Sequence, residues 1–468
     1  MLCVVASRYP TALPDTLFHF PAMKKIFRSL LATALLATAT VAANAQPTAP
    51  VSATAAAPDT ALITLDARVI NPVSTQSYEA FRAAVQPLIK QMAGKKVVAM
   101  GEGTHGTAEF YKLRFWLTRI LMEEHGFTQV ALENDYTDTY QLNEALRQPN
   151  AAVAPLMKAH LYSIWQNQET AELLTWLQTH NRAHRRQLTL RGIDAAYVMP
   201  EAQALSTLAA RYPKAGLQDL TTQLTNAAQL QDSVWAGMNI QGYKMPRKRW
   251  LSSGLAGYHV TEKLQQALLT ARLPRRQKEQ AEGFVLDAKR AFDLFYQFDT
   301  YKRDSSRDSL MAETTKFLVP GKNDKVIVWA HNGHVSRKST DPTDNNGGGM
   351  GSYLERLFPG QYFVLGTSTA TGTFAATTDR FIARTSPIAS YPLEKPIAGS
   401  WEATLDAVSV PTFFLQTQQL GAQNLKRLHR FVGYKPDSGK DSYSQFKLTE
   451  AYDVLLFVRQ TTAATPLK

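Results

Sequence analysis

Apolar runs of strand length alternate with amphipathic helical patterns along the first part of the chain. The apolar runs lie at 96–101, 126–135 and 187–195. The helical patterns lie at 77–92, 107–125, 137–147 and 169–180. Strands that are apolar throughout and separated by helices are typical of a parallel sheet with both faces covered. Residues 61–200 are therefore predicted to form the first half of an α/β core.

The pattern changes between residues 201 and 318, where long helical periodicities appear with few strand signals. We interpret 201–318 as a helical subdomain inserted between two strands of the sheet. The sheet is expected to resume at 325–331. Further strands are predicted at 361–369, 371–378, 408–416 and 451–458. Residues 319–468 thus complete the predicted core and add a smaller C-terminal α+β part.

The N-terminal region has the three parts of a secretory signal peptide, in order. A basic segment around Lys24 precedes an apolar stretch at 30–41, and Ala43 to Ala45 form a cleavage site. The apolar stretch is too short to span a bilayer. We therefore expect residues 23–45 to be removed, with no membrane insertion afterwards, and the protein to be periplasmic or secreted.

The segments on either side of this signal are expected to contribute nothing to the fold. Residues 1–22 are interpreted as upstream sequence translated from a misassigned start, and 46–60, rich in Ala, Pro and Thr, as a flexible linker. The single cysteine is Cys3. The mature chain would then contain no disulfide, no cysteine nucleophile and no thiolate metal site.

The formal net charge of +12 is dispersed along the chain. A basic balance suits binding to nucleic acid or to an anionic surface. The densest stretch, Lys244 to Arg249, is nevertheless short and contains a proline. We interpret it as solvated surface and expect no nucleic-acid partner.

Acidic and imidazole side chains follow four of the predicted strands. They are Glu102 and His105 after the first, Glu133 and Asp135 at the end of the second, Asp194 after the third, and His331 and His334 after the fourth. Ligands of open α/β sheets bind beyond the carboxyl ends of the strands, so these groups are expected to converge. Such a cluster is typical of a catalytic or metal site. Other histidines have ordinary polar or mixed surroundings and receive no role: His180, His184, His259 and His429.

Arg114 falls inside the apolar stripe of the predicted helix at 107–125. An arginine that faces a core needs a carboxylate, because an unpaired buried charge is costly. Glu102 and Glu133 are the expected partners. The alternative is that the side chain extends along its stem to the surface.

The loop from Gly101 to Gly106 reads GEGTHG and matches the dinucleotide-binding pattern G-x-G-x-x-G. An acidic residue, Glu133, even ends the next strand. Glu102, however, would place a carboxylate where a pyrophosphate must lie. We therefore do not favour a nucleotide site.

Two other chemistries remain for the cluster. His331 and His334 have the spacing H-x-x-H and, with nearby carboxylates, suit zinc or another divalent ion, although they follow a strand. Alternatively, a histidine that is oriented by a carboxylate removes a proton from water. No G-x-S-x-G motif is present, which leaves a serine-esterase mechanism unsupported. We favour water activated by histidine, with no metal and no cofactor.

Several segments resemble the erythromycin esterase family. The segment 97–135, which contains GEGTHG, resembles the first motif of that family, and VIVWAHNGHV at 326–335 resembles its second. RDSLMA at 307–312, GYKPDS at 433–438 and the segment 448–466 are also similar. The resemblance extends from about residue 60 to residue 466, nearly the whole mature chain.

The resemblance implies a site, an activity and a fold like the one predicted above. His105 corresponds to the general base that acts on water. The polar residues around it correspond to Glu102, Arg114, Glu133, Arg307, His331 and His334. The implied substrate is a small-molecule ester, including the macrolactone of macrolide antibiotics, and the implied enzyme needs no metal. We expect a monomer.

In the expected mechanism, His105 deprotonates water, and either Glu102 or Glu133 orients its imidazole. The groups expected to stabilise the oxyanion or to protonate the leaving alcohol are Arg114, Arg307 and His331. Two other functions remain as alternatives. One is metal or haem binding in the cell envelope, and the other is modification of an exopolysaccharide.

Overall fold

The computed structural model describes residues 63–195, 197–238, 247–296, 307–338, 349–378 and 384–467. These residues belong to one compact unit, Pro58–Lys468. The predicted signal peptide and linker lie outside them, as does part of the basic stretch at 244–249. Within the described residues, no helix is both long enough and apolar enough to cross a membrane.

Nine strands of the described chain form one sheet, in the order β1-β8-β11-β6-β2-β5-β3-β4, with β7 paired to β6. Their bounds are β1 Asn71–Pro72, β2 Val97–Glu102, β3 Gln129–Asp135, β4 Thr189–Asp194, β5 Val326–His331, β6 Tyr362–Ala376, β7 Ala389–Pro392, β8 Thr412–Gln416 and β11 Val454–Thr461. The run from β11 to β4 is parallel throughout. β8, β1 and β7 pair antiparallel. A separate antiparallel pair is formed by β9 (Arg427–Arg430) and β10 (Tyr443–Phe446).

Alternate residues of each strand face two different apolar cores. Val97 and Ala99 of β2 belong to the core on one face, and Val98 and Met100 to the core on the other. Every residue of β2 is buried, because helices cover both faces. The predicted α/β class with a largely parallel central sheet is therefore confirmed.

Helices from the N-terminal part pack on one face of the sheet. They are α1 (Tyr78–Ala84), α2 (Gln86–Ala93), α3 (Ala108–Glu124), α5 (Val153–His160) and α6 (Gln168–Ala183), with the short helix η2 (Ser163–Trp165). Helix α4 (Tyr136–Leu146) contributes side chains to both cores. The other core includes the shorter helices α12 (Asn332–Val335), α13 (Met350–Leu357), α14 (Trp401–Asp406) and α15 (Leu448–Ala451).

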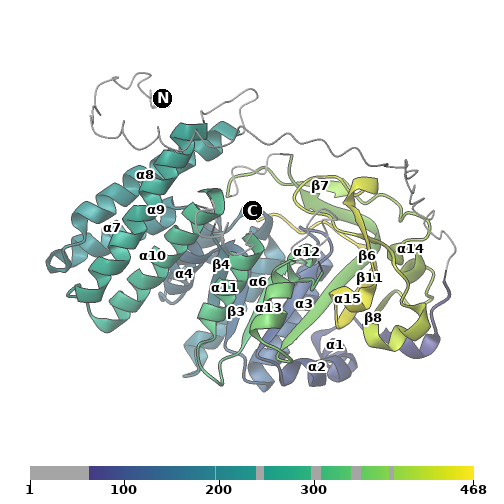
Figure 1. Cartoon of the computed structure of the whole chain (residues 1–468). Helices are drawn as coiled ribbons and strands as arrows, with labels where there is room; N and C mark the ends of the chain where they lie inside the picture. Colours follow the sequence, from purple (N-terminus) through teal and green to yellow (C-terminus); the bar gives the residue numbers. More distant parts are fainter. Residues whose placement is uncertain are drawn as a thin grey trace, which may run out of the picture. The chain divides into compact units, whose positions relative to one another are not determined.

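The chain between β4 and β5 is helical where it is described. Its helices are α7 (Met199–Arg211), α8 (Gln218–Met238), α9 (Arg247–Thr270), α10 (Arg275–Tyr296) and α11 (Arg307–Leu318), with the short helix η3 (Pro213–Ala215). Helices α7 to α10 pack against one another, and α10 also contacts α4 (Figure 1). Helix α11 packs against β4 and α13, which brings its first residue to the end of the sheet.

Two segments differ from the expected elements. The helix predicted at 77–92 is two helices that meet at Val85, because Pro87 has no N–H to continue the ladder of hydrogen bonds. The two strands predicted at 361–369 and 371–378 are one, β6. Its first half pairs with β2 and its second half with β7, so the strand changes partner without a turn.

Candidate active site

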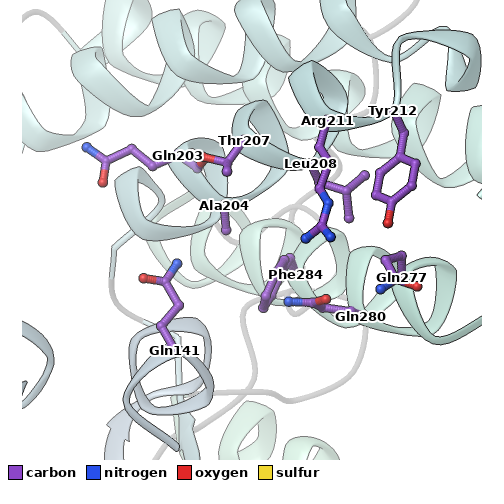
Figure 2. Close-up of a pocket in the computed structure, with 10 residues that line it drawn as sticks. All are labelled: Gln141, Gln203, Ala204, Thr207, Leu208, Arg211, Tyr212, Gln277, Gln280 and Phe284. Atoms are coloured by element: carbon purple, nitrogen blue, oxygen red, sulfur yellow. The ribbon is translucent and has the colours of Figure 1, made fainter. Parts of the chain in front are cut away.

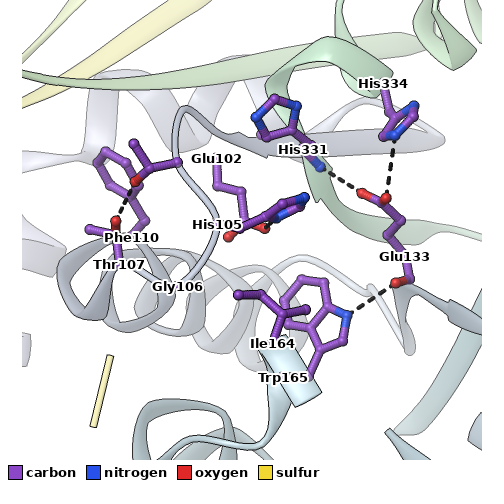
Figure 3. Close-up of polar contacts among 12 residues, drawn as sticks. Glu102, His105, Gly106, Thr107, Phe110, Glu133, Ile164, Trp165, His331 and His334 are labelled. Carbon is purple, nitrogen blue, oxygen red and sulfur yellow. Dashed lines mark hydrogen bonds and ion pairs between the residues drawn. The ribbon is translucent and has the colours of Figure 1, made fainter. Parts of the chain in front are cut away.

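The carboxyl ends of β2, β3, β4 and β5 gather polar side chains at one edge of the sheet (Figure 3). The seven predicted site residues all lie there: Glu102, His105, Arg114, Glu133, Arg307, His331 and His334. The parallel register places Glu102 directly opposite His331. Because all strands of a parallel sheet end at the same edge, the sheet itself brings the side chains at the strand ends together.

Glu102 and His105 form a buried pair. His105 Nδ1 lies 2.7 Å from Glu102 Oε1, and the two residues are 3% and 0% exposed. Because a carboxylate only accepts hydrogen bonds, we assign the ring proton to Nδ1. The Nε2 lone pair of His105 is then free to take a proton from a substrate or from water. Glu133 makes no hydrogen bond to His105 among the described contacts, and its two oxygens face Arg307, His334 and the N–H of His331.

Arg114 is fully buried and pairs with the other oxygen of Glu102. Its Nη2 donates to Glu102 Oε2 at 2.5 Å, and its Nε donates to the carbonyl of Phe110 at 3.3 Å. Its guanidinium carbon lies 4.7 Å from the ring of Trp329 and 5.1 Å from that of Tyr111. Arg114 therefore fixes Glu102 from the core side and has no surface with which to touch a ligand.

The glycines of the loop pack against other segments of the protein. A Cβ atom on Gly103 would lie 2.6 Å from the carbonyl oxygen of Thr367, and one on Gly106, which has φ +68°, would lie 2.3 Å from the carbonyl oxygen of Ala375. The loop N–H groups are also occupied, since Gly103 donates to Thr367 Oγ1 and His105 to the carbonyl of Val432. These donors are not available for a pyrophosphate, which argues against a dinucleotide site.

Glu133 connects the other half of the cluster. Its Oε1 accepts from Arg307 Nη2 at 2.9 Å and lies 3.3 Å from His334 Nε2, while its Oε2 accepts from the backbone N–H of His331 at 2.9 Å. Trp165 Nε1 donates to its carbonyl oxygen. Burial by itself would raise the pKa of Glu133, but the charges of His334 and Arg307 outweigh it and hold that pKa well below its usual range.

Arg307 stands at the start of α11 and links two strand ends. Its Nε and Nη2 make a two-pronged contact with Asp194, at 2.9 and 2.5 Å, and Nη2 also reaches Glu133. Asp194 is the last residue of β4 and Glu133 belongs to β3, so the arginine joins the ends of neighbouring strands. This bidentate geometry is strong and directional.

His334 lies between two carboxylates and is assigned as the imidazolium. Its Nδ1 is 2.7 Å from Asp308 Oδ1, and its Nε2 faces Glu133. Burial lowers its pKa, but Glu133 and Asp308 raise it more, to about 10. Arg307 Nη1 lies 3.1 Å from Nε2 of the same ring. A protonated ring has no acceptor for this direct approach, and Glu133 Oε1, which lies 2.9 Å from Arg307 Nη2 and 3.3 Å from His334 Nε2, balances the charges of the two groups.

His331 is the neutral histidine of the cluster. Burial first, and then the neighbouring rings of His105 and His334, hold the pKa of His331 well below its ordinary value. Its Nδ1 accepts from the N–H of Gly333 at 3.2 Å, which places the ring proton on Nε2. Both ring nitrogens of His334 lie against carboxylates, so in this arrangement the H-x-x-H pair does not direct two open nitrogens at one point, as a zinc site requires.

Tyr434 is a site residue that the sequence reasoning missed. Its ring lies 4.7 Å from that of His105, as close as the His331 ring at 4.8 Å on another side. It is brought there by the neighbouring Val432, which pairs with the loop at Thr104. Burial, and then the charge of Glu133, raise the pKa of Tyr434 well above its usual value, so the hydroxyl keeps its proton. The only indication in the sequence was that Tyr434 lies in the segment GYKPDS, which resembles a segment of the family named above.

The prediction that His429 has ordinary polar or mixed surroundings is wrong. The residue is fully buried, and its Nδ1 lies 2.7 Å from Oε1 of the equally buried Glu402. Burial raises the pKa of Glu402, but His429 and Arg430 lower it further, to about 2. A lone histidine with no acidic neighbour in sequence gives no sign of such a partner.

Asp135 also departs from the expected convergence. It follows Glu133 by two residues, but the register between β3 and β4 shifts between Leu132 and Asp135. Asp135 Oδ1 caps α4 by accepting from the N–H of Asp138. Its second oxygen lies with Glu201 and Asp287, a different acidic group.

A pocket of about 440 Å³ lies elsewhere, between α4, α7 and α10 (Figure 2). Glutamine side chains surround an apolar floor that includes Leu208 and Phe284. None of the seven predicted site residues lines it. This pocket therefore gives no information about the polar cluster at the strand ends.

Comparisons with known proteins identify a family, and solved structures share the fold. The family described as erythromycin esterase matches residues 122–461. Erythromycin esterase type II of Escherichia coli is 22% identical over 415 residues, covering 83% of this chain and 94% of the relative. A solved succinoglycan biosynthesis protein has a TM-score of 0.68 at 18% identity, covering 85% of this chain and 96% of its own. A mutant of the erythromycin esterase EreC in its open conformation has a TM-score of 0.61 at 18% identity, covering 83% and 95%.

Proposed function

The chain belongs to the erythromycin esterase family of hydrolases, and on that premise we propose that it cleaves a carboxylic ester with a water molecule activated by His105. The observation that best supports this proposal is the buried pair in which Glu102 Oε1 accepts a hydrogen bond from His105 Nδ1 at 2.7 Å. This contact fixes the tautomer that a general base needs, with the lone pair on Nε2.

The proposed reaction proceeds through one tetrahedral intermediate. Nε2 of His105 takes a proton from water as the water oxygen bonds to the ester carbonyl carbon. The intermediate then expels the alkoxide, which receives that proton from the His105 imidazolium. The products are a carboxylic acid and an alcohol, and no covalent link to the enzyme forms.

Two neutral donors beside His105 support stabilisation of the oxyanion. His331 carries its proton on Nε2, and the Tyr434 hydroxyl is held protonated by burial. Both rings lie within 5 Å of the His105 ring, measured between centroids. Donors held in place in this way stabilise the developing negative charge more than the neutral ester. We assign them this role, and we assign Arg114 only the positioning of Glu102.

Three properties of the natural system are part of the same proposal. The substrate is a small-molecule ester, and macrolides are the first class to test because relatives of this chain are named erythromycin esterases. The protein acts in the periplasm or outside the cell, which rests on the signal-like segment at 23–45. It acts as a monomer.

The test is a hydrolysis screen of macrolides and simple esters, with products detected by mass spectrometry. A hydrolysed macrolactone gains the mass of one water molecule, and a simple ester splits into a carboxylic acid and an alcohol. We expect activity in the wild type and its loss in His105→Ala with the melting temperature little changed. His259→Ala is the control, because His259 makes the same 2.7 Å contact to a glutamate three residues on, but at the surface. Activity retained by His105→Ala would refute the proposed role of that residue.

A further inference from the structure

Three acidic side chains meet at a second place in the protein, away from His105. Asp135 stands at the end of β3, Glu201 in α7 and Asp287 in α10. They are 0%, 0% and 1% exposed. One oxygen from each lies within 4.8 Å of the other two. Residues far apart in sequence thus bring three carboxyl groups together inside the core.

These carboxyl groups lack hydrogen-bond donors. Asp135 Oδ1 accepts from the N–H of Asp138, whereas the other five oxygens of the trio have no well-aligned hydrogen-bond partner, although the carboxyl groups of Glu201 and Asp287 lie close to each other and to Thr137. Burial, and then the neighbouring Asp135 and Asp287, raise the pKa of Glu201 well above its usual value. Like charges cannot be buried together unless a proton or a cation neutralises them.

The nearby arginines have other partners. Arg384 forms an ion pair with Asp138, and Arg290 donates to Thr314 Oγ1 at 2.9 Å. Both stand close enough to moderate the charge of the trio, but neither makes a hydrogen bond or ion pair with it among the described contacts. These arginines therefore do not neutralise the trio by direct contact, which leaves a proton or a cation from solution to do so.

A neutral oxygen also faces the trio. The hydroxyl of Thr137, in the first turn of α4, is 0% exposed and has no aligned hydrogen-bond partner, although it lies beside the Glu201 carboxyl. A buried hydroxyl without a partner costs free energy. Together with the carboxylates, it forms a donor set made only of oxygen.

We propose that Asp135, Glu201 and Asp287 bind one divalent cation, with the Thr137 hydroxyl beside it. A shared proton joins only two carboxyl groups and leaves the remaining oxygens without partners. One cation contacts an oxygen of each. Opposite ligands of a bound Ca²⁺ lie about 5 Å apart, twice the usual Ca²⁺–oxygen distance, so the spacing of the trio allows all three contacts.

The donor set selects the class of cation. Carboxylate and hydroxyl oxygens are hard ligands, which favour Ca²⁺, Mg²⁺ or Mn²⁺ over zinc or copper. Ca²⁺ fits best because its coordination geometry is flexible and needs no exact octahedron. The ion would join β3, α7 and α10 and so tie the helices to the end of the sheet.

The pocket in Figure 2 lies along the same helices. Gln141, Ala204 and Phe284 line it, and they stand one turn from Thr137, Glu201 and Asp287, respectively. Residues three or four apart share one face of a helix. The pocket therefore lies on the same faces of α4, α7 and α10 as Thr137, Glu201 and Asp287, one turn away.

The test measures the cation itself and does not depend on ester hydrolysis. Mature protein is stripped with a chelator and dialysed against Ca²⁺, Mg²⁺ or Mn²⁺, and bound metal is counted by elemental mass spectrometry. We expect one Ca²⁺ per chain, a higher melting temperature with Ca²⁺, and loss of both in Asp287→Asn and in Glu201→Gln. Glu279→Gln is the control, because that glutamate is exposed and pairs with Arg275. His105→Ala should bind Ca²⁺ normally.

Two results would overturn the cation site. If none of the three ions binds to the wild type and Asp287→Asn is as stable as the wild type or more so, the trio shares protons. If Ca²⁺ binds but both amide variants retain it, the ion occupies another place. If a variant does not fold, the number of ions bound by the wild type and the shift in its melting temperature test the cation site.

Discussion

The substitution Glu102→Gln tests whether Glu102 controls the protonation of His105. In the wild type, Glu102 uses one oxygen for His105 and the other for Arg114, at 2.7 and 2.5 Å. Glutamine has nearly the same shape but one acceptor and one NH₂ donor. Arginine only donates, so the single oxygen must turn to Arg114. The NH₂ group then faces His105 Nδ1, which becomes an acceptor and sends the ring proton to Nε2.

This reversal removes the lone pair that would attract the proton of water. In a serine protease triad, an amide in place of the carboxylate lowers kcat about 10⁴-fold by the same reversal. We expect a loss of about 10³- to 10⁴-fold in kcat/KM here, or about 4 to 5 kcal/mol in transition-state stabilisation. The variant also leaves the buried Arg114 without a counter-charge, so the free energy of unfolding should fall by about 3 to 5 kcal/mol, and the kinetics are measured where urea titration shows the variant to be folded.

Two measurements check the reasoning. Nitrogen NMR of protein labelled in histidine reports the tautomer of His105 directly, and kinetics on an ester found by the screen report activity. Glu262→Gln is the matched control, since Glu262 holds the exposed His259 at the same distance. If Glu102→Gln moves the proton to Nε2 but keeps activity within tenfold, His105 is not the base. If the proton stays on Nδ1, the orientation inferred for the amide is wrong.

Two further predictions concern stability. Arg114→Met leaves Glu102 buried without a cation and should lower the free energy of unfolding by about 3 to 5 kcal/mol. The double variant with Glu102→Gln should recover part of that loss in urea titrations, and no recovery would contradict the pairing. His334 has a folded pKa of about 10, well above its unfolded value of about 6.5, so its contribution is complete below pH 6.5 and is lost as pH rises through 10. His334→Gln should therefore lose less stability than the wild type between pH 7 and pH 10, and parallel losses would count against a protonated His334.

The sequence predicted the part of the site that depends on local pattern. Buried strands are recognisable as apolar runs, and in a parallel sheet the residue after each run lies at the common edge. This rule located Glu102, Glu133 and His331 at the cluster. The position of Arg114 in an apolar stripe likewise required a carboxylate, and Glu102 supplies it.

The rest of the site depends on tertiary contacts, which cannot be predicted from the local sequence pattern. Tyr434 reaches His105 because Val432 pairs with the loop more than 300 residues earlier in the chain. Asp135 leaves the cluster because of one register shift in β3, which cannot be read from an apolar run. His429 finds Glu402 across two elements of the C-terminal region. In each case tertiary pairing determines the surroundings, and the residue type alone does not.

The charges around His105 are consistent with the general-base role proposed for it. Glu102 is paired with Arg114, and Arg307 and His334 lie among three carboxylates, Glu133, Asp194 and Asp308. Proton transfer from water then creates a new pair of charges, an imidazolium on His105 and an oxyanion on the substrate. Glu102 faces the first, and the neutral donors of His331 and Tyr434 flank the second. Fixed groups that meet charges only as they form stabilise the transition state more than the bound ester, which is the condition for faster chemistry.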